Sequence, residues 1–236
     1  MEIPNHYQFP KTLEEAKAIQ EQLRSQVIVR DQLETVQWVA GVDVAFEDNY
    51  ALTGRTSPAH RWRGQPLTKS AIAVFKFPDL ELQETALATL PTCFPYIPGF
   101  LSFREIPAIL EALKKLTVVP DLIFCDGQGI AHPRRLGIAS HLGVLIDCPT
   151  IGVAKSRLVG SHEEISLEKG SQQPLIDRGE TIGVVLRTKY KVKPLYISPG
   201  HRISLPTAIQ YVLQSTTKYR LPETTRIADR LSKAKI

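Results

Sequence analysis

Cysteine is scarce in this sequence. Only three of its 236 residues are cysteines, Cys93, Cys125 and Cys148, and they lack the closely spaced pairs of a zinc site. Neither a disulfide-built scaffold nor a structural zinc site is therefore favoured. Because Cys125 and Cys148 lie in apolar segments, we expect them to be buried thiols in a reducing compartment.

Long apolar runs and a large excess of one charge are also absent. No run of 18 apolar residues occurs, and the opening MEIPNHYQFP lacks a charged segment followed by an apolar one. We therefore expect a soluble, cytoplasmic protein with no membrane partner. The net charge is only +5, from 29 basic and 24 acidic residues. Binding to a polyanion would require the arginines to be gathered on one face.

The composition that is present is that of a globular protein. Hydrophobic residues make up 43% of the chain and charged residues 22%, with no internal repeat and no low-complexity segment. A chain of this length can bury a full core. We expect one domain over residues 1–236 and a monomer.

The spacing of apolar residues predicts an α/β fold. An amphipathic helix is expected at 12–27, where Thr12 and Glu15 have capping-box spacing. An antiparallel meander should follow, with an arginine-bearing exposed loop after its first strand. Helices and strands then alternate, which is typical of parallel pairing. The prediction is a mixed sheet of five to seven strands with helices on both faces. The strands are expected at 38–47, 70–78, 80–90, 121–125, 149–155, 180–188 and 193–198. The further helices are expected at 102–116, 134–146, 204–216 and from 223, with a surface loop at 159–179.

Two aspartates stand where strands would carry them into a site. Asp43 interrupts an apolar strand, where a carboxylate is costly unless it is paired or bound to a metal. A salt-bridged aspartate at a strand edge is an equal alternative. Asp126 ends an apolar strand before Gly127, at the carboxyl edge where α/β sheets hold ligands, but it could instead begin an Asx turn.

Three further residues have weaker individual signals. Glu105 stands three residues after Ser102, so a capping box is the favoured reading of it. His201 precedes the last long helix and could be a loop histidine facing solvent. Lys155 ends a strand and could be a solvated lysine.

Together these residues suit phosphodiester hydrolysis. That reaction needs hard oxygen ligands around Mg²⁺, an activated water and relief of charge at the leaving oxygen. Asp43 and Asp126 would bridge the metal, and Glu105 would be a further ligand or would orient water. His201 would move a proton, and Lys155 would place a positive charge near the scissile phosphate.

The segment PYIPGF is a candidate for contact with a base. Pro95 and Pro98 flank Tyr96 and Ile97, with Gly99 following, and this makes a stiff turn. Its ring could replace an extruded base in a duplex, or it could be packed in the core. A second candidate region follows Asp126 and is predicted to bind an anion at a helix start and to let a flat base approach the backbone, through Gly127, Gly129, His132, Arg134 and Arg135.

At this point the sequence resembles the endonuclease V family. The similar blocks are VAGVDVAF, PYIPGFLSFRE, PDLIFCDGQGIAHPRRLGIASHLG, PTIGVAKSRL and GHRIS, in order from Val39 to Ser204, and the closing YRLPETTRIAD is similar as well. The resemblance implies a ribonuclease H-like fold and Mg²⁺, or Mn²⁺ in its place, held by Asp43 and Asp126, with Glu105 and His201 completing the site.

The resemblance also implies a function. The Tyr96 turn would be a strand-separating wedge, and the glycine loop would line a pocket for hypoxanthine. The enzyme would cut the second phosphodiester 3′ to the deaminated base, leaving a 3′-hydroxyl and a 5′-phosphate. Two departures stand out: Gln128 where His or Asn is expected, and Pro206 where an acidic or polar residue is common. The partner would be DNA with deaminated bases; the alternatives are inosine-containing RNA as the substrate, and a binder of damaged nucleic acid without activity.

Overall fold

The computed structural model describes residues 3–4, 9–47 and 66–234. The arginines and the tryptophan of the loop expected after the first strand lie outside these residues. The described elements, in chain order, are α1 (Leu13–Arg24), β1 (Trp38–Glu47), β2 (Leu67–Lys76), β3 (Glu81–Pro91), α2 (Leu101–Leu113), β4 (Leu122–Cys125), α3 (Ile138–Ile146), β5 (Thr150–Ala154), β6 (Gln172–Asp177), β7 (Glu180–Leu186), β8 (Leu195–His201), α4 (Leu205–Gln214) and α5 (Glu223–Ser232).

One mixed sheet organises the described chain. Its strand order is β3-β2-β1-β4-β5-β8-β7-β6. The first three strands form the expected antiparallel meander, and β4 and β5 run parallel to β1. The remaining strands β8, β7 and β6 pair antiparallel. The sheet is therefore assembled from two antiparallel parts joined by a short parallel centre.

The sheet has eight strands, so the expected range of five to seven is wrong. The additional strand is β6, which lies within the segment 159–179 that was expected to be a loop. Leu175 is the one buried residue of this strand, and Pro174 sits beside it. An edge strand with little buried surface and a proline has no alternating pattern by which a sequence could reveal it.

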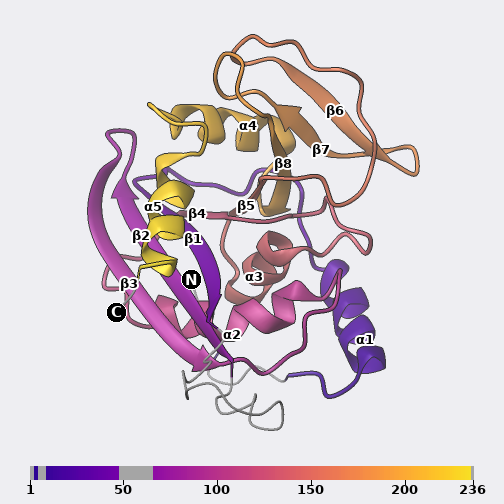
Figure 1. The fold of residues 1–236 in the computed structure, drawn as a ribbon, viewed down its shortest axis with the longest axis vertical. Helices are drawn as coiled ribbons and strands as arrows, with labels where there is room; N and C mark the ends of the chain where they lie inside the picture. The colour runs from indigo at the N-terminus through magenta and orange to yellow at the C-terminus, as the bar shows by residue number, and fades with distance from the viewer. Residues whose placement is uncertain (1–2, 5–8, 48–65, 235–236) are drawn as a thin grey trace, which may run out of the picture.

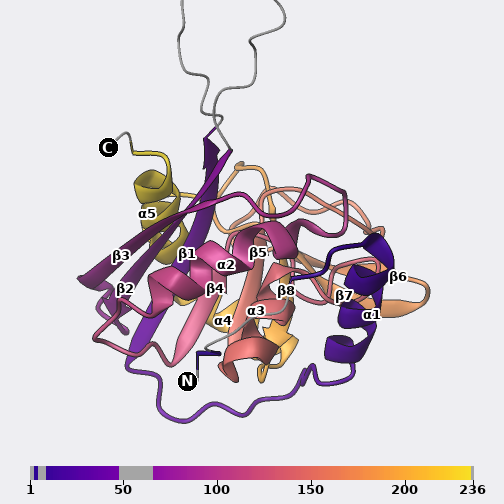
Figure 2. The same cartoon turned by 90° about the horizontal axis from the view of Figure 1, so that it is seen from below.

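Helices cover both faces of the sheet, as predicted. The side chains of α2 and α3 share one hydrophobic core with β1, β2 and β4. A second core on the opposite face receives residues of α4 and α5. Figure 1 shows α5 lying across β1 and β2, and the view from below separates it from α2 and α3 (Figure 2). The architecture is the ribonuclease H-like α/β fold.

The helix starts match the sequence unevenly. The Thr12 hydroxyl accepts a hydrogen bond from the Glu15 backbone at 3.1 Å, so the first predicted cap is confirmed. The expected Ser102 capping box is wrong, because α2 begins at Leu101 and the Ser102 hydroxyl lies 2.9 Å from Nδ1 of buried His141. Glu105 is therefore not used as a cap.

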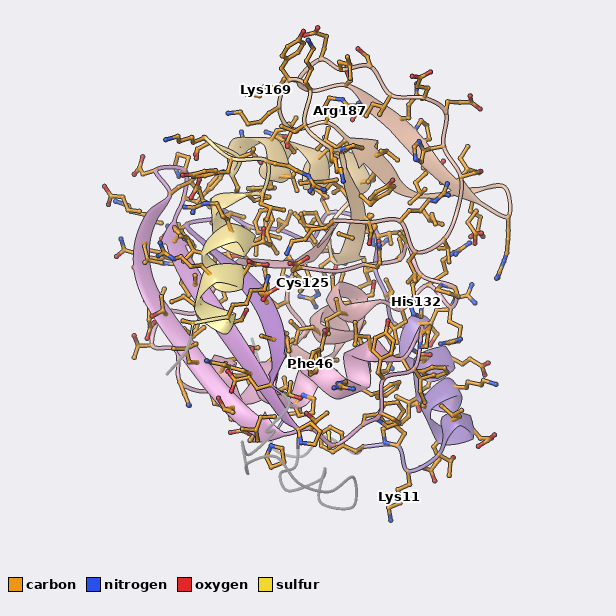
Figure 3. All side chains as sticks on the ribbon, viewed as in Figure 1. Lys11, Phe46, Cys125, His132, Lys169 and Arg187 are labelled. Atoms are coloured by element: carbon orange, nitrogen blue, oxygen red, sulfur yellow. The ribbon has the colours of Figure 1, made fainter. Side chains whose placement is uncertain are left out.

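The predicted burial of two thiols is confirmed. Cys125 and Cys148 are buried and free, and Cys93 is exposed and free. Cys125 lies in the middle of the ribbon, whereas Lys169 lies at its periphery (Figure 3). Within the described part of the chain, none of the helices has the length and apolar composition needed to cross a bilayer.

Candidate active site

Strand register brings the first two aspartates together. β1 and β4 are parallel, with Val42 opposite Cys125, so the residues that follow, Asp43 and Asp126, are neighbours. The Asp126 backbone N–H also donates to the Val42 carbonyl at 3.0 Å. Burial leaves 7% of Asp43 exposed. The pairing of two strands distant in sequence therefore places two carboxylates at one edge of the parallel centre.

Helix α5 brings a third aspartate to them. A Cβ atom on Gly41 would lie 2.1 Å from the backbone carbonyl carbon of Thr224, so only glycine allows α5 to pack this closely on β1. From this helix the Ser232 hydroxyl donates a hydrogen bond to Oδ2 of Asp43. Asp229, one turn earlier, reaches the same edge. The C-terminal helix is thus part of the site.

The three aspartates form a compact oxygen cluster. One carboxylate oxygen each of Asp43, Asp126 and Asp229 lies within 4.8 Å of the others, and no further group of this kind occurs among the described residues. Such hard oxygen donors at this spacing suit a divalent cation. Asp229 was not predicted. A signal for it does exist, since α5 buries a stripe of small side chains, which allows close approach to a strand: Thr224, Thr225, Ala228 and Ser232.

Two lysines partly neutralise the cluster. Lys155, which follows β5, forms ion pairs with Oδ2 of Asp126 and, at 2.6 Å, with Oδ1 of Asp229. Lys233 contacts the same Asp229 oxygen at 2.7 Å. Burial opposes ionisation of Asp229, but these lysines hold its pKa below the ordinary value. Lys155 is therefore an ion-pair partner of the cluster at a strand end that also reaches solvent, with 37% of its side chain exposed.

Glu105 lies beside the cluster, as the fifth residue of α2, and is almost fully buried. Burial raises the pKa of Glu105 to about 8, and the negative charges of Asp43 and Asp126 act in the same direction. The positive charge of Arg104 opposes this rise in the pKa of Glu105. The geometry thus brings Glu105 near the aspartates but outside their tightest grouping.

The electrostatics indicate an excess of negative charge. Burial raises the pKa of Asp43, and its contacts with Asp126 and Asp229 add to the shift, while the Ser232 hydroxyl lowers it. Carboxylates held together in this way repel one another, and a bound cation would reverse that repulsion. Carboxylates crowded into a buried site are also typical of functional sites.

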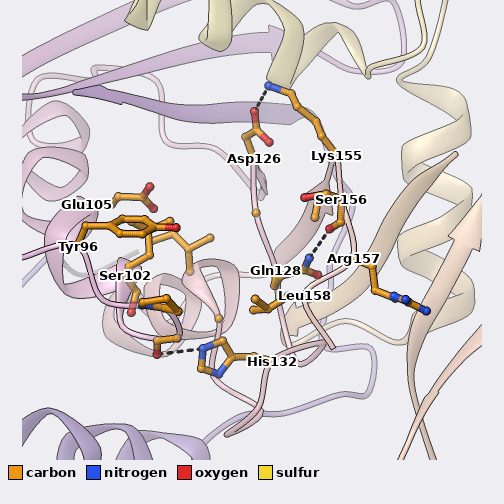
Figure 4. A pocket seen from close by; sticks show the side chains of 17 residues that line it. Tyr96, Ser102, Glu105, Asp126, Gln128, His132, Lys155, Ser156, Arg157 and Leu158 are labelled. Atoms are coloured by element: carbon orange, nitrogen blue, oxygen red, sulfur yellow. Dashed lines mark hydrogen bonds and ion pairs between the residues drawn. The ribbon is translucent and has the colours of Figure 1, made fainter. Parts of the chain in front are cut away.

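A cavity of about 410 Å³ opens next to the cluster. Its size lies within the range of small-ligand sites in proteins. Asp126 and Lys155 lie on one side of it, and Tyr96 and Glu105 lie together across from them (Figure 4). The predicted residues in its lining are Tyr96, Pro98, Gly99, Gly127, Gln128 and His132, and those not predicted include Ser156, Arg157 and Leu158.

The proline-flanked turn presents its aromatic ring. Tyr96 is 68% exposed, so the alternative of a tyrosine packed in the core is wrong. Ile97 packs partly against a small core of α1 and α2, which anchors the base of the turn. The Gly99 carbonyl accepts from Gln20 at 3.0 Å and Arg134 at 2.5 Å, and its distance to His132 Nε2 is 3.1 Å. The turn is rigid where it joins the fold and open at its tip.

The predicted anion site at 132–135 is not formed. The Arg134 guanidinium binds Gly99 and stacks 4.1 Å from the Phe100 ring. Arg135 pairs with Asp177 at 2.8 Å and Glu180 at 3.0 Å. Helix α3 begins at Ile138, four residues later than predicted. Both guanidinium groups are therefore occupied by the protein itself.

The two glycines after Asp126 differ from each other. A Cβ on Gly129 would lie 2.0 Å from the Pro199 carbonyl oxygen, so this glycine serves the packing of the loop on β8. It is not among the residues that line the cavity. Gly127 does line the cavity, where a Cβ would meet the Ile138 side chain at 2.5 Å.

His201 lies away from the carboxylates, which corrects its expected place in the site. It ends β8 opposite Thr150, the first residue of β5, whereas Lys155 follows the last. At the usual rise per residue these ends are about 13 Å apart. Its Nδ1 accepts from the Ile28 backbone at 3.3 Å, and its Nε2 lies 3.5 Å from Asp147. The prediction failed because β8 ends three residues later than the predicted strand 193–198 and runs antiparallel to β5.

Comparison with known proteins agrees with this geometry. The family model for endonuclease V matches residues 21–230. An endonuclease V of Rippkaea orientalis is 64% identical over 235 residues, covering 100% of this chain and 96% of the relative. The crystal structure of endonuclease V from Streptomyces avermitilis is 42% identical with a TM-score of 0.85, covering 98% of this chain and 95% of that one.

A further solved structure includes nucleic acid. Ciona intestinalis endonuclease V, in complex with a 24mer DNA containing an inosine followed by a ribo-adenosine, is 29% identical with a TM-score of 0.75. The alignment covers 95% of this chain and 97% of the Ciona chain. The family model and the full-length relatives together cover the sheet, the three aspartates and the proline-flanked turn. The chain is therefore a nuclease that belongs to the endonuclease V family.

Proposed function

We propose that this protein is a divalent-metal-dependent repair endonuclease that acts on DNA containing hypoxanthine. It would hydrolyse the second phosphodiester bond on the 3′ side of the deaminated base. Water adds to phosphorus, the bond to the 3′ oxygen breaks, and the products carry a 3′-hydroxyl and a 5′-phosphate. The observation that supports this most is the Asp43, Asp126 and Asp229 cluster beside a cavity of base-accommodating size.

Asp43, Asp126 and Asp229 would hold the cation, and Glu105 would orient water beside them. A bound Mg²⁺ supplies an activated water and relieves charge at the leaving oxygen. Lys155 would turn its ammonium group toward the phosphate that enters next to Asp126. Tyr96 would stack in the duplex in place of the extruded base, and the cavity would receive that base. Binding of the base away from the cluster is consistent with a cut displaced from the lesion.

A labelled duplex with one central hypoxanthine provides the test. With Mg²⁺ we expect a single nick at the second phosphodiester bond on the 3′ side of the hypoxanthine nucleotide. The matched duplex with adenine at that position should stay intact. The labelled product should be a ligase substrate only if it has the stated ends. An intact duplex, or equal cutting of both, would contradict the proposal.

Inosine-containing RNA is the second candidate substrate. The Ciona complex supports it, because the nucleotide after inosine in that structure is a ribo-adenosine. Competition between matched strands that differ only in sugar would separate the two. Faster cutting of the ribonucleotide strand would favour RNA, and faster cutting of the deoxyribonucleotide strand would favour DNA repair.

A further inference from the structure

One buried polar atom in the cavity wall lacks a partner. Gln128 lies two residues after Asp126, lines the cavity and is only 9% exposed. Its Oε1 is buried, and none of the described residues donates a hydrogen bond to it. A buried acceptor that has lost its hydration is unfavourable unless a ligand supplies a donor. The atom is therefore a candidate contact for whatever enters the cavity.

The orientation of this amide follows from its other end. Nε2 of Gln128 donates to the Ser156 carbonyl oxygen at 2.9 Å (Figure 4). Reversing the amide would set two oxygens against each other, because a carbonyl has no proton to donate. The NH₂ group is thus engaged, and the oxygen is the free end.

The backbone beneath the side chain is held firmly. The Gln128 carbonyl accepts from the Ala139 N–H at 3.0 Å, at the start of α3. A Cβ on Gly137 would lie 2.3 Å from that same carbonyl oxygen, so the two segments are in direct contact. The free acceptor is consequently fixed in position before a ligand arrives, which is what selective recognition requires.

Bases differ in what they would offer to such an acceptor. Deamination of adenine changes ring N1 from an acceptor to an N–H donor beside a carbonyl. Deamination of cytosine does the same at N3. Enzymes that extrude a base read it by hydrogen bonds to its pairing edge. A fixed acceptor at that edge would attract the ring N–H of the deaminated base and would face a lone pair on the parent base.

We infer that Gln128 is a specificity-determining residue whose Oε1 accepts a hydrogen bond from the ring N–H of the deaminated base. This inference rests on the proposed function and adds the atom that reads the lesion. It assigns to one side chain the discrimination between hypoxanthine and adenine. The same contact would serve uracil, which carries the equivalent N–H.

Replacement of the amide by a thioether tests the contact. Gln128→Met has similar length and no comparable acceptor. Binding would be measured by fluorescence anisotropy in EDTA, so that no cleavage is needed, with labelled duplexes carrying hypoxanthine, O6-methylhypoxanthine or adenine at one position. O6-methylhypoxanthine lacks the ring N–H. We expect the wild-type preference for hypoxanthine over both others to fall about tenfold in Gln128→Met, through weaker hypoxanthine binding alone.

Two comparisons control for folding and for general effects. Gln172→Met makes the same chemical change on exposed β6 and should keep the wild-type preference. Thermal unfolding should be cooperative in both variants. If Gln128→Met does not fold, Gln128→Leu provides the second variant, because it also lacks the acceptor and is shorter; it should show the same narrowed preference.

The outcomes separate this inference from the proposed function. Wild-type protein without a preference for hypoxanthine would overturn the proposed function. A wild-type preference that persists unchanged in Gln128→Met would overturn only the role of Gln128. An equal loss of affinity for every duplex would also overturn it, since that result indicates a general packing role.

Discussion

Acidic and basic side chains gather at both ends of strand β5, but the balance of their charges differs. At its start, His201, Arg202 and Asp147 contact one another, with an Arg202–Asp147 ion pair of 2.7 Å. Beyond its end, Lys155 faces Asp126 and Asp229, with Asp43 and Glu105 close by. The first group is balanced internally, whereas the second keeps an excess of carboxylates. The difference indicates that residual charge, and not the presence of titratable residues, marks the site.

The largest expected effect is a difference in cleavage rate between alanine substitutions of two aspartates, one at each end of β5. Asp229→Ala removes a ligand from the cluster and should lower the cleavage rate at least about a thousandfold, since metal-assisted charge stabilisation is worth several kcal/mol. Asp147→Ala, the matched change at the start of β5, should leave the rate nearly unchanged. Single-turnover cleavage of a hypoxanthine duplex measures both. Binding of that duplex should persist in Asp229→Ala, and comparable rates in the two variants would break the comparison.

Substitution of Lys155 would increase the excess of negative charge at the aspartate cluster. Lys155→Met should slow cleavage about a hundredfold, the usual order for loss of one group that stabilises a transition state. It should also lower the melting temperature in EDTA, because Asp126 loses its ion-pair partner and Asp229 keeps only Lys233. Added Mg²⁺ should reduce the difference in melting temperature between the variant and the wild type. Calorimetry with and without Mg²⁺ provides the measurement, and equal melting temperatures in EDTA would show that the lysine does not balance the cluster.

His201 should affect stability and not catalysis. His201→Leu leaves the Ile28 N–H without its acceptor, so the free energy of unfolding should fall by about 1–3 kcal/mol. The rate constant for cleavage should stay within about threefold of wild type, since the side chain touches no carboxylate of the cluster. Urea unfolding and single-turnover cleavage would be compared in one buffer. A large loss of rate in a stable variant would restore His201 to the site.

The last effect is confined to acid pH and concerns two buried neutral histidines. Burial lowers the pKa of His141 to about 3 and that of His132 to about 4. The unfolded chain binds these protons near pH 6.5, so their contribution to stability is complete above that pH and is lost as the pH falls. Each should cost about 1.4 kcal/mol per pH unit across this window. His141→Gln should give a shallower decline between pH 6.5 and 4 in denaturant unfolding, and an unchanged slope would contradict the assignment.

Some residues of the site could be identified from the sequence, and others could not. Asp43 could be found because it interrupts an apolar strand, and Asp126 because it directly follows one; both features are visible without a fold. Tyr96 could be found because prolines make its turn stiff. Asp229 could not be found in this way, because a polar residue on an amphipathic helix is ordinary. Its role depends on Gly41 allowing the helix to reach β1.

Arginine roles were equally inaccessible to local reasoning. Arg134 and Arg135 precede a helix, which suggested an anion site, yet their partners Gly99, Asp177 and Glu180 lie far away along the chain. The same holds for β6, whose edge position leaves no pattern in its residues. Local sequence describes what a side chain can do, but it does not describe which partner has already engaged it.

The sequence by itself determined the α/β class, the meander and two of the three clustered carboxylates, because periodicity and isolated charges act over a few residues. Tertiary structure alone decided that Asp229 joins the cluster, that His201 lies at the other end of β5, and that Arg134 and Arg135 bind partners within the protein. The physical reason is that these outcomes depend on strand register and helix approach, which join residues up to 189 positions apart.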